Sequence, residues 1–143
     1  MNSKEIHELL HQVGYGHPGC IHEGKPYVMP MNYYHEGSDI YLFTTEGMKT
    51  HDIDANPEIC LQVEEINDAL HWRSVIVNGR ASRLTVQEDI DRAMHLIKER
   101  NPTLSPAINR TWIEAPGRSE ANAIYRIDAS EMSGRTTDGV SSR

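Results

Sequence analysis

The chain has little cysteine, no long apolar run and no excess of positive charge, and each shortage excludes a class of protein. Its two cysteines, Cys20 and Cys60, are too few for the disulfide framework that stabilises small secreted domains. Each lies in an apolar, strand-like run, so we expect two reduced, buried thiols. No stretch of about 18 apolar residues could cross a membrane, and the first residues do not resemble a signal peptide. We therefore expect a cytoplasmic protein.

The charge balance and the length limit the partners and the architecture. The formal net charge at pH 7 is −7, whereas nucleic acids and anionic lipid surfaces both bind basic faces. An anionic ligand would therefore need a local positive site. The 143 residues suit one domain. Because only 38% of them are hydrophobic, a monomer would bury a modest core and an oligomer would bury more.

Apolar periodicity predicts two amphipathic helices, one shorter helix and six strands. A helix is predicted over residues 3–13, with Ser3 as its N-cap, and a second one around Ile90 to Ile97. Residues 47–56 are expected to form the shorter helix. The strands are predicted over residues 15–21, 26–35, 40–45, 58–65, 72–84 and 125–132. The short gaps between them indicate an antiparallel β-barrel with peripheral helices, in one domain over residues 1–135 with a polar tail over 136–143.

Residues 26–49, PYVMPMNYYHEGSDIYLFTTEGMK, carry the most informative chemistry. Pro30 removes a ladder donor from its strand and marks a bulge or an edge where the backbone can face another group. Farther along, the chain leaves a strand at a corner where four residues converge: Thr44, Thr45, Gly47 and Lys49. Two hydroxyls, a flexible glycine and a lysine suit the terminal phosphate of a bound cofactor.

Residues 7–17, HELLHQVGYGH, match the zinc-protease pattern H-E-x-x-H-x-x-G-x-x-H at every specified position. In that pattern His7, His11 and His17 would bind zinc and Glu8 would be the general base. The residues before His7 are too few to build the sheet that supports such a helix, and the apolar stripe lies on its other face. We expect a solvated polar face, with a weak His7/His11 metal site and a zinc hydrolase as the alternatives.

Five blocks occur in the order found in one protein family. They are GKPYVMPMNY (24–33), IYLFTTEGMK (40–49), ANPEICLQVEE (55–65), WRSVIVNGRA (72–81) and IYRI (124–127). With them the chain resembles the pyridoxamine 5′-phosphate oxidase-like proteins of the FMN-binding split-barrel superfamily, especially the short bacterial members grouped with nitroimidazole-resistance proteins. The resemblance implies a six-stranded antiparallel Greek-key split barrel that forms a homodimer, with FMN at the dimer interface.

The resemblance also implies which residues hold the cofactor. A backbone segment would run beside the flavin ring, three residues would hold the ribityl chain and phosphate, and one residue would reach the cofactor from the other side. The backbone segment is Val28, Met29, Pro30, Met31 and Asn32. The residues that would hold the ribityl chain and phosphate are Thr44, Thr45 and Lys49, and the residue on the other side is Ser74. The alternatives from the residues alone are ordinary strand positions for the threonines and the serine, and a solvated lysine in a helix turn.

The function that the resemblance implies is a flavin-dependent oxidoreductase, in which the flavin carries the redox chemistry. No catalytic residue is assigned. Pyridoxamine phosphate oxidases grip their substrate phosphate with a C-terminal segment that bears arginine and histidine, and the last residues here, EMSGRTTDGVSSR, do not match it. We therefore expect a small-molecule substrate other than vitamin B6. A non-catalytic flavin-binding or carrier protein is the alternative, and the residues do not distinguish FMN from a deazaflavin or haem.

Overall fold

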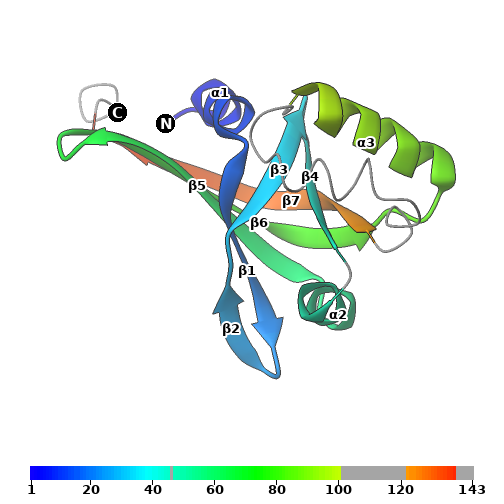
Figure 1. The fold of residues 1–143 in the computed structure, drawn as a ribbon. Helices are drawn as coiled ribbons and strands as arrows, with labels where there is room; N and C mark the ends of the chain where they lie inside the picture. Colours follow the sequence, from blue (N-terminus) through cyan, green and yellow to red (C-terminus); the bar gives the residue numbers. More distant parts are fainter. Residues whose placement is uncertain (46, 101–121, 138–143) are drawn as a thin grey trace.

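The computed structural model describes residues 1–45, 47–100 and 122–137, and for six of them only the backbone: Thr45, Met48, Lys49, Lys98, Arg100 and Asn122. The described part of the chain contains three helices and seven strands (Figure 1). In chain order they are α1 (Ser3–Val13), β1 (Tyr15–His22), β2 (Lys25–Val28), β3 (Met31–Glu36), β4 (Asp39–Thr45), α2 (Met48–Ala55), β5 (Glu58–Asp68), β6 (His71–Arg83), α3 (Gln87–Arg100) and β7 (Asn122–Thr136).

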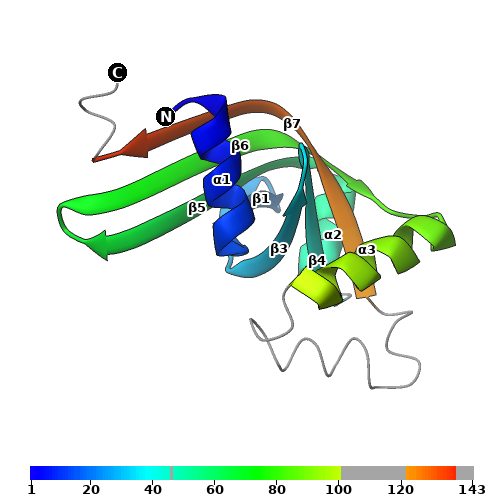
Figure 2. The same ribbon diagram turned by 90° about the horizontal axis from the view of Figure 1, so that it is seen from above.

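The strands form a closed antiparallel barrel, as predicted. The sheet order is β2-β1-β3-β4-β7-β6-β5, and β1 also pairs with β5, so six strands close on themselves while β2 extends from β1 outside the ring (Figures 1 and 2). The closure depends on Gly16, because a Cβ there would lie 2.7 Å from the carbonyl oxygen of Gln62 on β5. A larger residue would therefore push the two closing strands apart.

The single strand predicted over residues 26–35 is wrong, because the chain breaks there into β2 and β3. The break falls at Met29 and Pro30. Pro30 has no N–H to donate to a ladder, while the Met29 N–H donates to the carbonyl of Pro18 on β1 at 3.1 Å. β2 pairs with the end of β1, and β3 pairs with its first two residues. Both pieces therefore follow the same edge of β1.

Helix α1 has the predicted bounds and a different cap. Its N-cap is Asn2, not Ser3: the Asn2 side chain accepts from the Glu5 N–H, and the Glu5 carboxylate accepts from the Asn2 N–H, each at 2.9 Å. The helix crosses β5 and β6 (Figure 2), and its apolar stripe packs into the barrel core. Tyr33, fully buried on β3, donates its hydroxyl to the Leu10 carbonyl at 2.6 Å, which anchors the end of the helix.

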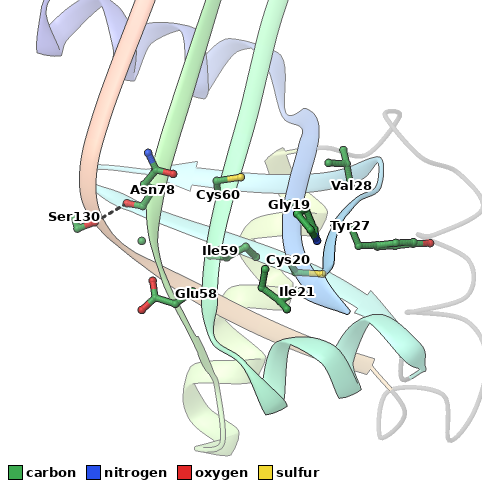
Figure 3. A pocket seen from close by; sticks show the side chains of 12 residues that line it. Gly19, Cys20, Ile21, Tyr27, Val28, Glu58, Ile59, Cys60, Asn78 and Ser130 are labelled. Carbon is green, nitrogen blue, oxygen red and sulfur yellow. Dashed lines mark hydrogen bonds between the residues drawn. The ribbon is translucent and has the colours of Figure 1, made fainter. Parts of the chain in front are cut away.

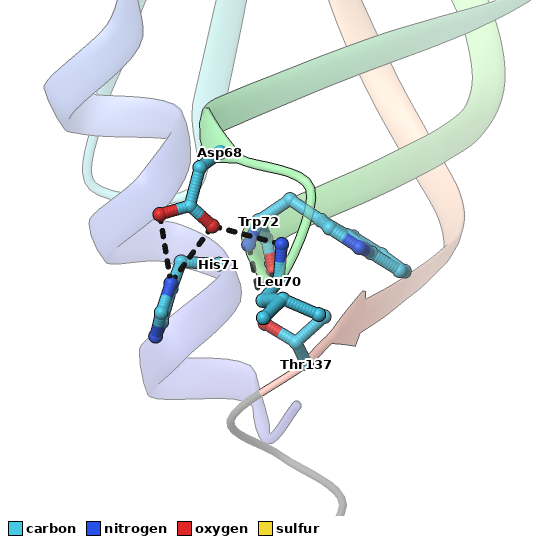
Figure 4. Close-up of polar contacts among 5 residues, drawn as sticks. All are labelled: Asp68, Leu70, His71, Trp72 and Thr137. Atoms are coloured by element: carbon cyan, nitrogen blue, oxygen red, sulfur yellow. Dashed lines mark hydrogen bonds and ion pairs between the residues drawn. The ribbon is translucent and has the colours of Figure 1, made fainter.

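The β5–β6 hairpin projects beyond the barrel, and polar contacts close its turn (Figures 1 and 4). The Asp68 carboxylate accepts from the Leu70 N–H and from His71 Nδ1, both at 2.8 Å, and the hydrogen bond with His71 lowers the pKa of Asp68. Strand β7 is longer than predicted and ends beside this hairpin, where the Thr137 N–H donates to the Trp72 carbonyl at 3.1 Å. The rest of the predicted tail lies outside the described residues.

Helix α3 covers a different part of the barrel from α1. Ala93 and Ile97 pack with Tyr34, Phe43 and Ile124 in a second apolar cluster on the outer side of β3, β4 and β7. In Figure 2 this helix lies beside β3, β4 and β7, away from the turn of the β5–β6 hairpin. None of the helices in the described ranges is long and apolar enough to cross a membrane.

Candidate functional site

A strand-to-helix corner forms where the sequence predicts a phosphate site. β4 ends at Thr45, and α2 begins at Met48 with Gly47 as its N-cap. The Thr50 hydroxyl accepts from the Gly47 N–H at 3.0 Å and lies 2.8 Å from its carbonyl oxygen, so the turn is held from within. The first-turn amides of a helix are donors for an anion. The first-turn sequence M-K-T-H contains no acidic residue and includes Lys49.

Two carboxylates on α2 fix this helix to the barrel. Asp52 is buried, and both of its oxygens lie within 3.0 Å of His22 Nδ1 at the end of β1. Hydrogen bonding to Asp52 raises the pKa of His22. Asp54 accepts from the Tyr125 hydroxyl at 2.9 Å and pairs with Arg83 at 3.0 Å. Because β1, β6 and β7 all hold α2, the orientation of the corner is set by the whole barrel.

The predicted ring edge, residues 28–32, coincides with the junction between β2 and β3. The side chains of Met29 and Met31 are buried in the core and Asn32 is also buried, while Val28 and Pro30 are exposed. Whether the backbone of this segment flanks a flavin ring stays a prediction. Continuing the register that pairs Tyr33 with Leu42 places Thr44 opposite Met31. The ring edge and the phosphate corner are thus neighbours.

The three predicted phosphate residues occupy this corner with different surroundings. Thr44 is buried on β4. Thr45 is the last residue of the same strand, and Lys49 is in the first turn of α2. The backbone places all three at the corner, and whether their side chains bind a phosphate stays a prediction.

Ser74 lies on β6, separated from residues 28–32 by β5 and β1. It belongs to a row of hydrogen-bonded side chains across the outer surface of three strands. Gln62 on β5 accepts from His17 on β1 at 3.1 Å and donates to Ser74 at 3.2 Å and to Glu64 at 2.9 Å. The structure therefore brings Ser74 to the face that contains the ring edge, but not into contact with it.

An open groove of about 320 Å³ runs over the same outer surface (Figure 3). Its lining includes Gly19, Val28, Cys60 and Asn78, so it spans β2, β1, β5 and β6. The thiol of Cys60 is half-buried and faces this groove, whereas Cys20 is buried as expected and its burial raises its pKa. The prediction that both thiols are buried is wrong for Cys60, because it occupies one of the outward positions of β5, which alternate with buried ones.

The zinc-protease pattern is not assembled. His7 Nδ1 hydrogen-bonds to Nε2 of the buried His35 on β3 at 2.9 Å, and the His11 ring lies 5.9 Å from that of His35. His17 is on β1 and bonds to Gln62. Within the described ranges, no three histidine, cysteine or acidic side chains form a group that could hold a metal ion. The expected solvated face is wrong for His7, since β3 places a histidine against it.

Sequence reasoning missed two features of this surface. It assigned no role to Gln62, and it considered His17 only as a zinc ligand. Strand alternation could have shown that both side chains point outward, but their contact depends on the pairing of β1 with β5, which local patterns do not reveal. The pair of His22 with Asp52 was missed for the same reason.

Comparison with known proteins places the chain in a family. The family model for pyridoxamine 5′-phosphate oxidase matches residues 2–136. The chain therefore belongs to this family, as its ordered sequence blocks predict.

Individual relatives share little sequence identity with this chain but match it over most of its length. An uncharacterized protein of Rhizobium meliloti is 26% identical over 120 residues, covering 81% of this chain and 80% of its own. An FAD-binding protein of Mesorhizobium loti has a similar crystal structure, with 26% identity, a TM-score of 0.75 and 95% of each chain covered. A proposed 5-nitroimidazole antibiotic resistance protein of Bacteroides thetaiotaomicron gives 18% identity and a TM-score of 0.71 over 93% of this chain and 82% of its own. The last comparison supports the fold alone.

Proposed function

We propose that this chain binds FMN on the outer surface of its barrel and is a flavin-dependent oxidoreductase that acts on a small molecule. The observation that carries the proposal is the corner between β4 and α2. It combines helix N-terminal amides and Lys49 with a neighbouring strand edge that Pro30 leaves without a donor. Membership of the oxidase family and the similarity to the FAD-binding protein of Mesorhizobium loti support a flavin as the ligand.

The residues divide between the two ends of the cofactor. The amides of α2, Thr44, Thr45 and Lys49 hold the phosphate and the ribityl chain. The backbone of residues 28–32 flanks the ring, and Ser74 approaches it across β5. A bound flavin would supply hydride or electron transfer, and the protein supplies position and electrostatics. FMN is the proposed form because the corner suits a terminal phosphate.

A second copy of the chain would cover the outer surface. Tyr15 on β1, Val28 on β2 and Ile76 on β6 are exposed apolar side chains on these strands, and Val28 lines the groove. Exposed apolar patches of this kind mark interaction surfaces in proteins. We propose a homodimer with the cofactor between its subunits, in a cytoplasmic protein.

The visible spectrum of the purified protein tests the cofactor. The expected result is the two-band flavin spectrum, with one FMN released per chain and identified by chromatography. Release of FAD would mean that the bound cofactor is FAD and not FMN. A colourless protein that takes up neither flavin would overturn the proposal, and stoichiometric zinc in such a protein would favour the hydrolase.

Reduction separates an enzyme from a carrier. Bound flavin that NADH or NADPH bleaches, and that air recolours, supports an oxidoreductase. Flavin that neither nucleotide nor a small-molecule donor bleaches would favour the non-catalytic flavin-binding protein.

A further inference from the structure

His17 lies on the outer surface and has no role in the cofactor assignments. The zinc pattern, which includes His17, is not assembled among the described residues. Gly16 on β1 pairs with Met31 on β3, and continuing this register by one residue places His17 opposite Pro30. The other edge of β1 faces β5, where His17 pairs with Gln62. His17 therefore lies between the predicted ring edge and the row that leads to Ser74.

The side chain of His17 points to the outer surface. It hydrogen-bonds to Gln62, whose amide also reaches Ser74. Two residues farther along β1, a Cβ on Gly19 would meet the side chains of Cys60 and Val28, so this face of β1 is the one that borders the groove. His17 is half-buried, and the exposed ring of Tyr15 packs edge-on against it at 5.8 Å. The imidazole is thus held on two sides.

The hydrogen bonds of Gln62 select the tautomer of the neutral His17 ring. The Glu64 carboxylate can only accept, so the atom of Gln62 that faces it at 2.9 Å must be the amide nitrogen. The amide oxygen then faces His17 Nδ1, which must be the N–H donor of that 3.1 Å contact. Nε2 of the neutral ring consequently carries a lone pair and is an acceptor.

We propose that His17 is a recognition residue of the flavin site, whose Nε2 accepts a hydrogen bond from an N–H of the bound isoalloxazine ring, and that Gln62 is the positioning residue that keeps Nδ1 protonated. The inference rests on the proposed function. The isoalloxazine ring has an imide edge with one N–H between two carbonyls. The row of side chains from His17 to Ser74 supplies an acceptor at one end and a hydroxyl at the other, so it is complementary in polarity to this imide edge. The backbone opposite His17 has no N–H of its own, since Pro30 stands there.

The test measures binding of FMN and of riboflavin, which has the same ring without the phosphate, to the flavin-free full-length protein. His17→Phe keeps a planar ring and removes the acceptor. We expect it to weaken binding of both flavins by the same factor, roughly tenfold for one lost hydrogen bond. His17→Gln, whose side-chain oxygen can replace Nε2 as an acceptor, is expected to recover most of the affinity. A merely structural His17 would not give this rescue.

Gln62→Leu tests the positioning role. Nitrogen chemical shifts of the His17 imidazole should report the Nδ1–H tautomer in the wild-type protein and a mixture of tautomers in Gln62→Leu. The circular dichroism of each variant checks that the barrel is retained.

The outcomes separate this inference from the proposed function. Wild-type protein that binds neither flavin would refute the proposed function and this inference with it. Wild-type protein that binds FMN, together with His17→Phe that binds both flavins within about twofold of it, would refute the inference alone. A wild-type Nε2–H tautomer would also refute it.

Discussion

Asp52 is a buried acidic residue, and its pairing with His22 makes the stability of the fold depend on pH at one position. Because Asp52 raises the pKa of His22, the pair stabilises the folded chain fully below the ordinary histidine pKa of about 6.5. That stabilisation is lost as the pH rises through the raised pKa. We predict that His22→Gln lowers the free energy of unfolding most at about pH 5.5, and that the difference from wild type shrinks by about pH 9. Denaturant unfolding at both pH values measures this.

A matched control is available on α3, where His95 lies 3.3 Å from Glu99 with both side chains exposed. An exposed pair contributes little to stability, so His95→Gln should have the same free energy of unfolding as the wild type at both pH values. A difference between His22→Gln and wild type that stays constant over this range would contradict the account of the pair.

At the scale of an element, two buried tyrosine hydroxyls each anchor a different helix. Tyr125 donates to Asp54 on α2, and Tyr33 donates to Leu10 on α1. We predict that Tyr125→Phe and Tyr33→Phe each lower the free energy of unfolding by about 1–2 kcal/mol, since each removes the hydrogen bond of a buried tyrosine. Only Tyr125→Phe should also weaken FMN binding, because α2 carries the phosphate corner. Thermal unfolding and FMN titration of both variants test this, and equal FMN affinity in the two would contradict the role assigned to α2.

The elements also show which structural features local sequence patterns predict correctly. The stripe of Ile6, Leu9 and Leu10 predicted α1 correctly, since a helix must bury its apolar face. Serine is a good cap, so the pattern predicts Ser3 as the N-cap, but Asn2 forms reciprocal hydrogen bonds with Glu5 and caps the helix instead. The apolar residues continue past Pro30, so the pattern predicts one strand over residues 26–35. The missing N–H of the proline divides it.

The candidate site was predictable where its residues are neighbours in sequence. The corner at Thr44, Thr45 and Lys49 follows from a strand end and a helix start, both visible in the pattern of residues. His17, Gln62 and the pair of His22 with Asp52 meet only because distant strands and helices pack together. Contacts of that kind depend on strand register, which single-sequence reasoning does not supply.

At the scale of the whole molecule, the outer surface predicts a dimer. Ile76 is 44% exposed on β6 over this surface, and Val86 is 55% exposed before α3, away from it. We predict that the wild type and Val86→Glu are dimers, and that Ile76→Glu is a monomer with the same circular dichroism, because a charge inside an apolar interface is costly. Light scattering coupled to size-exclusion chromatography gives the masses. A wild-type monomer, or an Ile76→Glu dimer of unchanged stability, would contradict this assignment of the interface.

FMN titration of the flavin-free protein tests the central claim most directly. Lys49→Ala removes the proposed phosphate ligand, and Lys25→Ala removes an exposed lysine of β2 as the control. The account predicts one FMN per chain, a loss of roughly tenfold or more in FMN affinity for Lys49→Ala only, and equal riboflavin affinity in all three proteins. Absence of FMN binding by the wild type, or identical FMN affinities in Lys49→Ala and Lys25→Ala, would contradict it.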